Sequence, residues 1–230
     1  MVINVLFLLL ALLLLWFPRQ WMRLGFSMSG RRKRNSSAEG RPNDSLLHRR
    51  EQGDPAIGFL TEFGKLRNYV DLLRGAAGSL ALMGGLAVEP CLQLASNANS
   101  EAGRWLVVGK LSILLVGLLI QTLRYDKQRI NFFAPIFFLS GISVGLCGLA
   151  GFFFAFVMIW AINPLLRKPQ RFLAIYSLLM AAFGWIFVGG LVLPVAALFF
   201  CYLPVLLSLL AQQPLVVYSR KAPRADATES

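Results

Sequence analysis

Charged residues are scarce in this chain and histidine is almost absent. Only 15% of the 230 residues are charged, and His48 is the one histidine. A soluble domain has nearer a quarter of its residues charged. The sequence also lacks the phosphate-binding Gly-x-x-x-x-Gly-Lys-Ser/Thr loop, the His-Glu-x-x-His zinc motif and the dinucleotide fingerprint. We therefore expect no metal and no cofactor, because the usual ligands and proton-transfer groups are missing.

Cysteine is also rare, and its spacing excludes two common small-domain frameworks. Cys91, Cys147 and Cys201 lie in three different apolar runs, without a Cys-x-x-Cys pair. Neither a disulfide framework nor a zinc ribbon can be built from this pattern. We expect three buried thiols.

Long apolar runs are what the chain has instead. Hydrophobic residues make up 57% of the sequence, and the mean hydropathy is +0.62. About 20 residues of helix, at a rise of about 1.5 Å each, cross the roughly 30 Å hydrocarbon core of a bilayer. Lipid cannot satisfy backbone polar groups, so helices are the expected form. The sequence predicts an all-α, polytopic transmembrane helical bundle with about six membrane segments.

Changes of composition along the chain predict five regions. Ile57, Leu60, Phe63, Leu66 and Val70 recur at spacings of three and four, which is typical of an amphipathic helix at a membrane surface. The predicted regions are an N-terminal signal-anchor helix (1–18), a basic cytoplasmic linker without regular structure (19–56), this amphipathic interfacial helix (57–74), the helical membrane bundle (75–218) and a polar tail (219–230).

Basic residues are concentrated in the segment 18–74, which carries 12 of the 23 lysines and arginines. Basic loops favour the cytoplasmic side of a membrane. We therefore predict an integral protein of a bacterial-type cytoplasmic (inner) membrane, with its N-terminus outside and 18–74 in the cytoplasm. Anionic lipid headgroups are the expected partner of the densest cluster, Arg31, Arg32, Lys33 and Arg34. No nucleic-acid-binding motif accompanies this charge, so no nucleic acid is expected.

The apolar run 132–162 is too long for one ordinary membrane span and allows two interpretations. An uninterrupted helix is the commoner form, and with it Arg167, Lys168 and Arg171 would face outside. A re-entrant hairpin, broken in the glycine-rich stretch 141–151, would instead place every basic segment on one side. We expect the single crossing and keep the hairpin as the alternative.

Two charged residues lie well inside the predicted membrane segments, Glu89 and Lys110. Both fall about 8–9 Å below the same predicted interface, on runs joined by a short loop. An unpaired charge in hydrocarbon costs a few kcal/mol, about 3 on insertion scales, so the positions favour an ion pair. The alternative is that Lys110 extends outward to the interface and that Glu89 is neutral, or lies near a break at Pro90 where water reaches it. Arg74, Trp105 and Tyr125 are expected to anchor the segment ends at the membrane interfaces.

Gly141-Ile142-Ser143-Val144-Gly145 matches the Gly-x-Ser-x-Gly pattern of a nucleophile elbow. That chemistry needs a strand–turn–helix context and a neighbouring general base. The pattern here lies in an apolar membrane run. We therefore expect close helix packing through Gly141, Gly145 and Gly151 instead.

Residues 65–77 read Lys-Leu-Arg-Asn-Tyr-Val-Asp-Leu-Leu-Arg-Gly-Ala-Ala. They locally resemble the start of the first membrane helix in the large membrane-bound acyltransferase family, where an Asp-x-x-Arg-Gly stretch leads into the bundle. The resemblance covers about 13 of the 230 residues, and Leu82 to Gly85 stand where the family has a histidine. It implies acyl transfer. Asp71 and Arg74, three residues apart, can also simply pair with each other on a helix.

The function expected from these patterns is that of a non-catalytic bundle subunit, assembly factor or scaffold. Its expected partners are membrane lipids and other membrane protein helices, or further copies of the chain. A small-solute or lipid transporter or channel is the alternative, and a lipid-modifying, acyl-transfer-like membrane enzyme is a second alternative.

Overall fold

A computed structural model describes most of the chain. The described residues are 2–18, 62–86, 88–93, 100–126, 129–166, 168–212 and 215–216. Within them the fold is an all-α helical bundle, which confirms the predicted class. The described helices and strands are β1 (Val2–Ile3), α1 (Val5–Trp16), α5 (Leu66–Met83), β2 (Leu92–Gln93), α6 (Ser100–Thr122), β3 (Leu123–Asp126), β4 (Arg129–Phe133), α7 (Ile136–Ile162), the 3-10 helix η1 (Asn163–Leu165), α8 (Pro169–Val188), α9 (Val192–Leu210) and β5 (Leu215–Val216).

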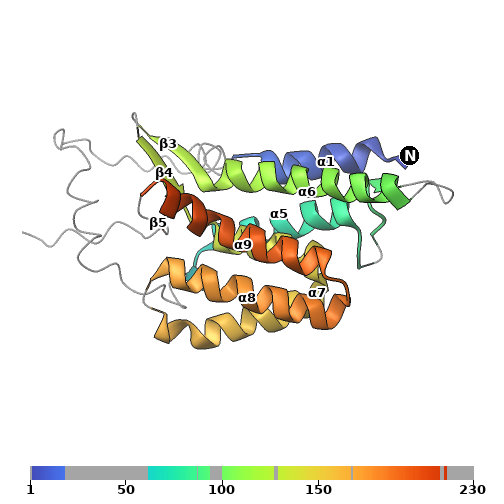
Figure 1. The fold of residues 1–230 in the computed structure, drawn as a ribbon. Coiled ribbons are helices and arrows are strands. Elements are labelled where there is room, and N and C mark those ends of the chain that lie inside the picture. The colour runs from blue at the N-terminus through green and yellow to red at the C-terminus, as the bar shows by residue number, and fades with distance from the viewer. Residues whose placement is uncertain are drawn as a thin grey trace, which may run out of the picture.

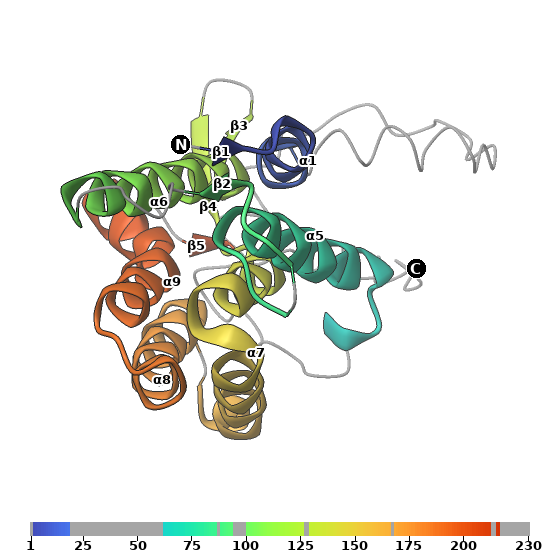
Figure 2. The ribbon, with the colours of Figure 1, turned by 90° about the vertical axis from the view of Figure 1, so that its right-hand side faces the viewer.

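The helices lie side by side along one direction (Figure 1). Viewed along the bundle, α5 lies between α1 and α7, α8 packs between α7 and α9, and α6 links α1 to α9 (Figure 2). Contacts between neighbours thus close a ring in the order α1, α5, α7, α8, α9, α6. The core inside this ring is aliphatic and aromatic, with Phe138, Phe172 and Tyr176 fully buried.

Four of the described helical segments are long and apolar enough to cross a membrane, judged by length and composition. They are α6, the segment 136–165, α8 and α9. Helix α1 is also apolar but has 12 residues, so it is only about 18 Å long. The chain is therefore a membrane protein, as its composition predicted.

Helix α7 is not a single rod. Gly148 has φ 71° and ψ 169°, a non-helical conformation that glycine adopts readily because it has no Cβ. The rings of Phe137 and Trp160 lie 6.0 Å apart, whereas a straight helix would separate these residues by about 34 Å. The two limbs therefore fold back on each other, and both are visible end on (Figure 2). Residues 136–162 form the hairpin that the sequence analysis treated as the alternative to one long crossing.

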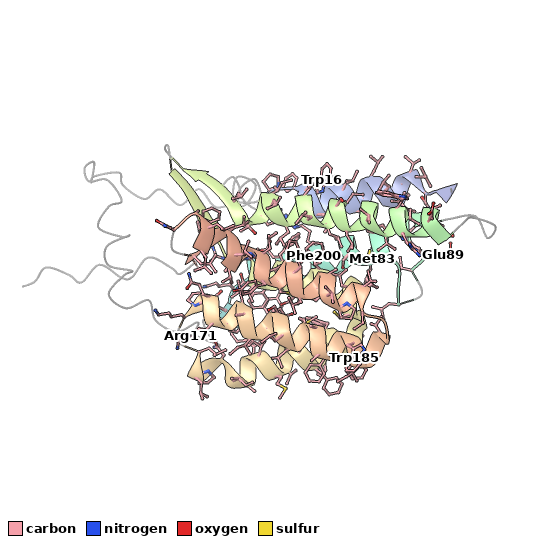
Figure 3. The ribbon with its side chains drawn as sticks, viewed as in Figure 1. Trp16, Met83, Glu89, Arg171, Trp185 and Phe200 are labelled. Atoms are coloured by element: carbon pink, nitrogen blue, oxygen red, sulfur yellow. The ribbon has the colours of Figure 1, made fainter. Side chains whose placement is uncertain are left out.

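This reversal brings α7 back to the end of the bundle at which it begins. Helix α8 starts there, and Arg171 lies at the same end as β3 and β4, while Trp185 lies at the opposite end (Figure 3). The basic residues Arg124, Arg129, Lys168 and Arg171 therefore share one end of the bundle. A single crossing of 132–162 would have placed basic residues on both sides of the membrane. The hairpin in this fold removes that conflict.

The first helix of the membrane bundle predicted to start at residue 75 ends early. Helix α5 is continuous through Arg74 and Gly75 and stops at Met83, because Gly84 and Gly85 take positive φ values of 85° and 123°. Accordingly, residues 66–74 form no helix separate from the one that follows, and residues 57–61 lie outside the described part. The chain then turns back, and the Cys91 amide donates to the Ala81 carbonyl at 2.9 Å.

Short strands close both ends of the bundle. Beyond the turn after α5, β2 pairs antiparallel with β1. At the other end, β3 and β4 form an antiparallel hairpin, and β5 adds to β4 in parallel, with Phe132 opposite Leu215. The segment after α9 is thereby tied to the segment before α7.

The reversal at Gly148 predicts a specific sidedness. On a cysteine-free background, Arg124→Cys and Lys168→Cys should react from the same side of the membrane, because α7 returns to its starting end. Gly190→Cys, in the turn between α8 and α9, should react from the other side. An impermeant maleimide applied to sealed, oriented vesicles measures this. Reaction of Lys168→Cys together with Gly190→Cys, and opposite to Arg124→Cys, would contradict the hairpin.

Candidate functional site

The first half of α5 buries polar and charged side chains. Asn68, Asp71 and Arg74 are 3%, 2% and 6% exposed. Their spacing of three residues places them on one side of the helix, toward α1 and α7. Charged side chains are almost never fully buried unless they are paired. These residues are therefore the strongest candidates for a polar site in the described part of the chain.

Arg74 reaches from α5 to the end of α1. Its Nη1 donates a 2.7 Å hydrogen bond to the Phe17 carbonyl, directly after the last residue of α1. Gln121 of α6 donates to the same carbonyl at 2.9 Å and to the Leu15 carbonyl at 3.3 Å. The final carbonyls of a helix have no partner within the helix. We call this arrangement of Phe17, Arg74 and Gln121 the carbonyl clasp.

The charge of Arg74 is balanced inside the bundle. Its Nη2 lies 3.8 Å from Asp71 Oδ1, so the pair that the spacing allowed does form. The guanidinium also lies over the ring of Phe138 on α7, 5.2 Å from the ring centroid. A cation over an aromatic face gains up to about 2 kcal/mol when it is desolvated. Arg74 thus contacts three helices at once, which is a structural role.

A second polar group lies at the start of α5. The Asn68 side-chain amide donates to the Glu62 carbonyl at 2.9 Å and to Glu62 Oε2 at 2.8 Å. Glu62 also forms an ion pair with Lys65. These contacts hold the segment 62–65 against the helix that it precedes.

A third polar group lies among α7, α8 and α9. The Tyr176 hydroxyl donates to Ser140 Oγ at 3.1 Å, and Ser140 donates to the Ile136 carbonyl at 2.8 Å. Ser143 donates to the Leu139 carbonyl at 2.8 Å and lies 3.9 Å from the Cys201 thiol. Ser143 is the serine of the Gly-x-Ser-x-Gly pattern. In this structure it is part of a helix and bonds to that helix's own backbone, so the geometry is that of a packed core serine.

The glycines of this pattern lie at the contact between α5 and α7. A Cβ on Gly141 would come within 2.3 Å of the Leu72 carbonyl oxygen, and one on Gly145 within 2.7 Å of Ser79 Cβ. Gly151 is less tightly enclosed, because its Cβ would meet Cys147 Cβ at 3.2 Å. The two helices are close enough for Ser79 Oγ to donate to the Gly141 carbonyl at 3.3 Å.

Glu89 and Lys110 do not form the expected ion pair. No ion pair or hydrogen bond joins them, although both are described residues. Glu89 is exposed, and it lies beyond Met83 at the end of the bundle (Figure 3). The physical reason is the early end of α5, which leaves Glu89 in a loop instead of on a helix at the depth of Lys110.

The three expected interfacial anchors have different surroundings. Arg74 is buried in protein contacts, whereas Trp105 is 73% exposed near the start of α6. The backbone of Tyr125 lies in β3, and its side chain is outside the described part. Arg31, Arg32, Lys33 and Arg34 also lie outside the described residues.

Comparisons with protein-family models, with curated proteins and with solved structures found no match for this chain.

The carbonyl clasp is the feature that sequence reasoning missed. Gln121 is a polar residue in an apolar run, but its acceptor is a backbone carbonyl 104 residues away. Every residue carries such a carbonyl, so no side-chain pattern marks this partner. Only the amide of Gln121 and the charge of Arg74, both costly in a membrane, signalled that an acceptor was needed.

Removing the clasp should loosen α1. We expect Arg74→Met and Gln121→Leu each to lower the free energy of unfolding by about 1–3 kcal/mol, because buried polar partners lose their bonds. Thermal unfolding of the protein in detergent micelles measures the loss. Arg104→Met, at an exposed position on α6, serves as the control and should change little. Equal effects of Arg104→Met and Arg74→Met would show that the clasp carries no stability.

The contact between α5 and α7 makes a separate prediction. Gly145→Leu should destabilise the fold by more than about 2 kcal/mol, because the new side chain overlaps the Ser79 backbone and separates the helices. Ser143→Ala should cost about 1 kcal/mol or less, since it removes one hydrogen bond to the helix's own carbonyl. Unfolding midpoints of the two purified variants give the comparison. A larger loss for Ser143→Ala than for Gly145→Leu would reverse the assignment.

Proposed function

We propose that this protein is a non-catalytic membrane scaffold or assembly subunit that binds a helix of another membrane protein along α6. The observation that carries the proposal is a line of exposed residues on that helix. Trp105, Gly109, Ser112 and Val116 are spaced by four, three and four residues, and all four are exposed. This spacing places them in one row facing outward, and we call the row the α6 seam.

Small residues at its centre suit the α6 seam to a helix partner. A Cβ added to Gly109 would meet nothing within 4 Å. Ser112 keeps its hydroxyl bonded to the Val108 carbonyl at 2.9 Å, so its side chain stays close to the helix. Helix pairs in membranes pack through small residues, because these let the two backbones approach. Contact with lipid chains does not require small residues, so a partner helix explains the small residues better than lipid alone.

The internal bonding of the bundle supports a structural role. The carbonyl clasp, the Asp71–Arg74 pair and the Tyr176–Ser140 bond all connect groups of the chain itself. A scaffold needs such internally satisfied contacts, because its own fold must be stable before a partner binds. The partner surface then has to be on the outside of the ring of helices.

The orientation is part of the same proposal. The basic end of the bundle, with Arg124, Arg129, Lys168 and Arg171, faces the cytoplasm of a bacterial-type inner membrane, and the N-terminus lies outside. Anionic headgroups on that side would meet the basic residues, including the cluster Arg31, Arg32, Lys33 and Arg34. The shared end of Arg124, Arg129, Lys168 and Arg171 in the bundle supports this orientation.

The test compares two glycines of α6. Gly109→Leu, in the α6 seam, should reduce co-purification of a partner at least fivefold while leaving the unfolding midpoint unchanged. Gly103→Leu makes the same chemical change at a position that also has open space but lies on another side of the helix. It should leave co-purification intact. Partners are measured by cross-linking the tagged protein in membranes, followed by quantitative mass spectrometry.

Three outcomes would overturn the proposal. Equal partner recovery with Gly109→Leu and Gly103→Leu would exclude the α6 seam. Cross-links that join only copies of the chain would make it a homo-oligomer contact. A chain recovered alone from cross-linked membranes would have no partner helix to scaffold.

A transporter or channel is the second candidate, and the hairpin of α7 is the observation that favours it. Broken or re-entrant helices commonly form substrate sites in transporters. Gly148 breaks α7, and residues 148–150 at the tip of the hairpin are exposed. Solute flux in vesicles containing the purified protein, compared between the natural chain and Gly148→Leu, discriminates the two functions. Flux that depends on Gly148 would favour transport over the scaffold.

A further inference from the structure

Helix α1 exposes a row of leucines on the outside of the bundle. These side chains are between 46% and 77% exposed, and their spacing of three and four residues places them on one side of the helix. The opposite side of α1 packs into the bundle through Ala11 and Leu15, which are fully buried. We call the exposed leucines the α1 face, and they are Leu6, Leu9, Leu10 and Leu13.

Polar groups bound this face at both ends. At the start, the Asn4 side chain accepts a hydrogen bond from the Phe7 amide at 3.4 Å. The strand before it, β1, runs across the end of the bundle and does not lengthen the helix (Figure 2). At the other end lies the carbonyl clasp, and Arg19 follows two residues after Phe17 in the sequence. The distance from Asn4 to Phe17 along a helix is about 20 Å.

Helix α6 carries polar residues with a similar separation. It runs beside α1 in the same direction (Figure 1), and a Cβ on Gly117 would lie 3.2 Å from Leu15 Cβ. Lys110 precedes this contact and therefore accompanies the first half of α1, while Gln121 lies in the clasp. Lys110 and Gln121 are about 17 Å apart along α6. The hydrocarbon core of an ordinary bilayer is about 30 Å thick, so both helices bring polar groups into it.

The opposite side of the bundle has the ordinary length. Helices α8 and α9 have 20 and 19 residues, which gives them lengths of about 30 Å and about 29 Å. Trp185 on α8 lies on the other side of the bundle from Trp16 on α1 (Figure 3). The same protein therefore presents a short apolar side and a full-length apolar side to one membrane. A bilayer meets a short apolar side by becoming thinner there.

We propose that the α1 face binds phospholipids with short acyl chains and thins the bilayer beside α1. Short chains cover the leucines and leave Asn4 and Lys110 at the level of the headgroups, whereas longer chains surround these polar groups with hydrocarbon. The two helices thus select lipid by the distance between their polar groups.

The character of the α1 face favours lipid over a protein helix as its occupant. The exposed residues of α1 are all large, and they are Val5, Leu6, Phe7, Leu9, Leu10, Leu13 and Trp16. Helix pairs in membranes pack through small residues, and leucine side chains have the same apolar character as lipid chains. The α1 face therefore differs from the α6 seam, and the lipid preference is independent of the proposed scaffold function.

The experiment measures quenching of single tryptophans by phosphatidylcholines with brominated chains. Trp16 and Trp185 are 38% and 59% exposed, so both reach the lipid. One full-length variant keeps Trp16 alone and the other keeps Trp185 alone, with phenylalanine at the remaining tryptophan positions. Each is placed in vesicles that mix plain eighteen-carbon phosphatidylcholine with a brominated fourteen- or eighteen-carbon one. Trp16 should prefer the fourteen-carbon lipid at least threefold, whereas Trp185 should not.

Removing the polar groups at the start of the α1 face tests the cause of this preference. Asn4→Leu combined with Lys110→Met should reduce the preference at Trp16 to the value at Trp185, and Lys110→Met alone should lower it by a smaller factor. Arg104→Met removes a charge from an exposed position nearer the start of α6 and should leave the preference unchanged. Size-exclusion elution verifies the fold of each variant before reconstitution.

A short-chain preference at Trp16 alone, lost when Asn4 and Lys110 are replaced, supports the proposal. Equal preferences at Trp16 and Trp185, or a preference of Trp16 for the eighteen-carbon lipid, would overturn it. A preference that survives both replacements would show that the polar groups do not set the thickness. If no brominated lipid quenches Trp16, protein covers α1 and the α1 face is not a lipid site.

Discussion

The close approach of the α5 and α7 backbones is the contact on which the other features depend. A Cβ on Gly75 would lie 2.5 Å from the Phe138 carbonyl oxygen, and one on Gly141 would overlap the backbone of α5. Only glycine at these places permits the distance. That distance brings Arg74 over Phe138 and Ser79 to the Gly141 carbonyl. It also holds the first limb of α7 in place, so that the second limb can pack against it.

The hydrogen bonds inside the bundle follow from a second constraint, which the surrounding lipid imposes. Lipid offers no partner for backbone or side-chain groups, so each must find one in the protein. The carbonyl at the end of α1 accepts hydrogen bonds from Arg74 and Gln121, and the Tyr176 hydroxyl donates to Ser140. The bonds from Arg74 and Gln121 join segments that are distant in the sequence, whereas the Tyr176–Ser140 bond joins the consecutive helices α8 and α7. They leave outward-facing apolar surfaces, such as the α6 seam, as the surface that a membrane partner would meet.

The reversal at Gly148 links the fold to its orientation. Each helix that crosses the bundle moves the chain to the other end, and a hairpin does not. Because α7 returns, the basic residues before it and after it share one end. The glycine allows a turn that a residue with a side chain would find strained. One residue with an unusual backbone conformation therefore decides on which side of a membrane Lys168 and Arg171 would lie.

Composition by itself determined that this chain is an all-α membrane bundle, since α6, α8 and α9 fall within the apolar runs that predict helices. Only the tertiary structure decided between a crossing and a hairpin for 136–162, because both bury the same apolar side chains and have the same hydropathy. It also separated Glu89 from Lys110, by ending α5 at Met83, and gave Gln121 a carbonyl acceptor. The physical reason is that hydropathy depends on side chains taken one at a time. Helix reversals and backbone acceptors depend on φ and ψ at a few residues and on which segments meet in space.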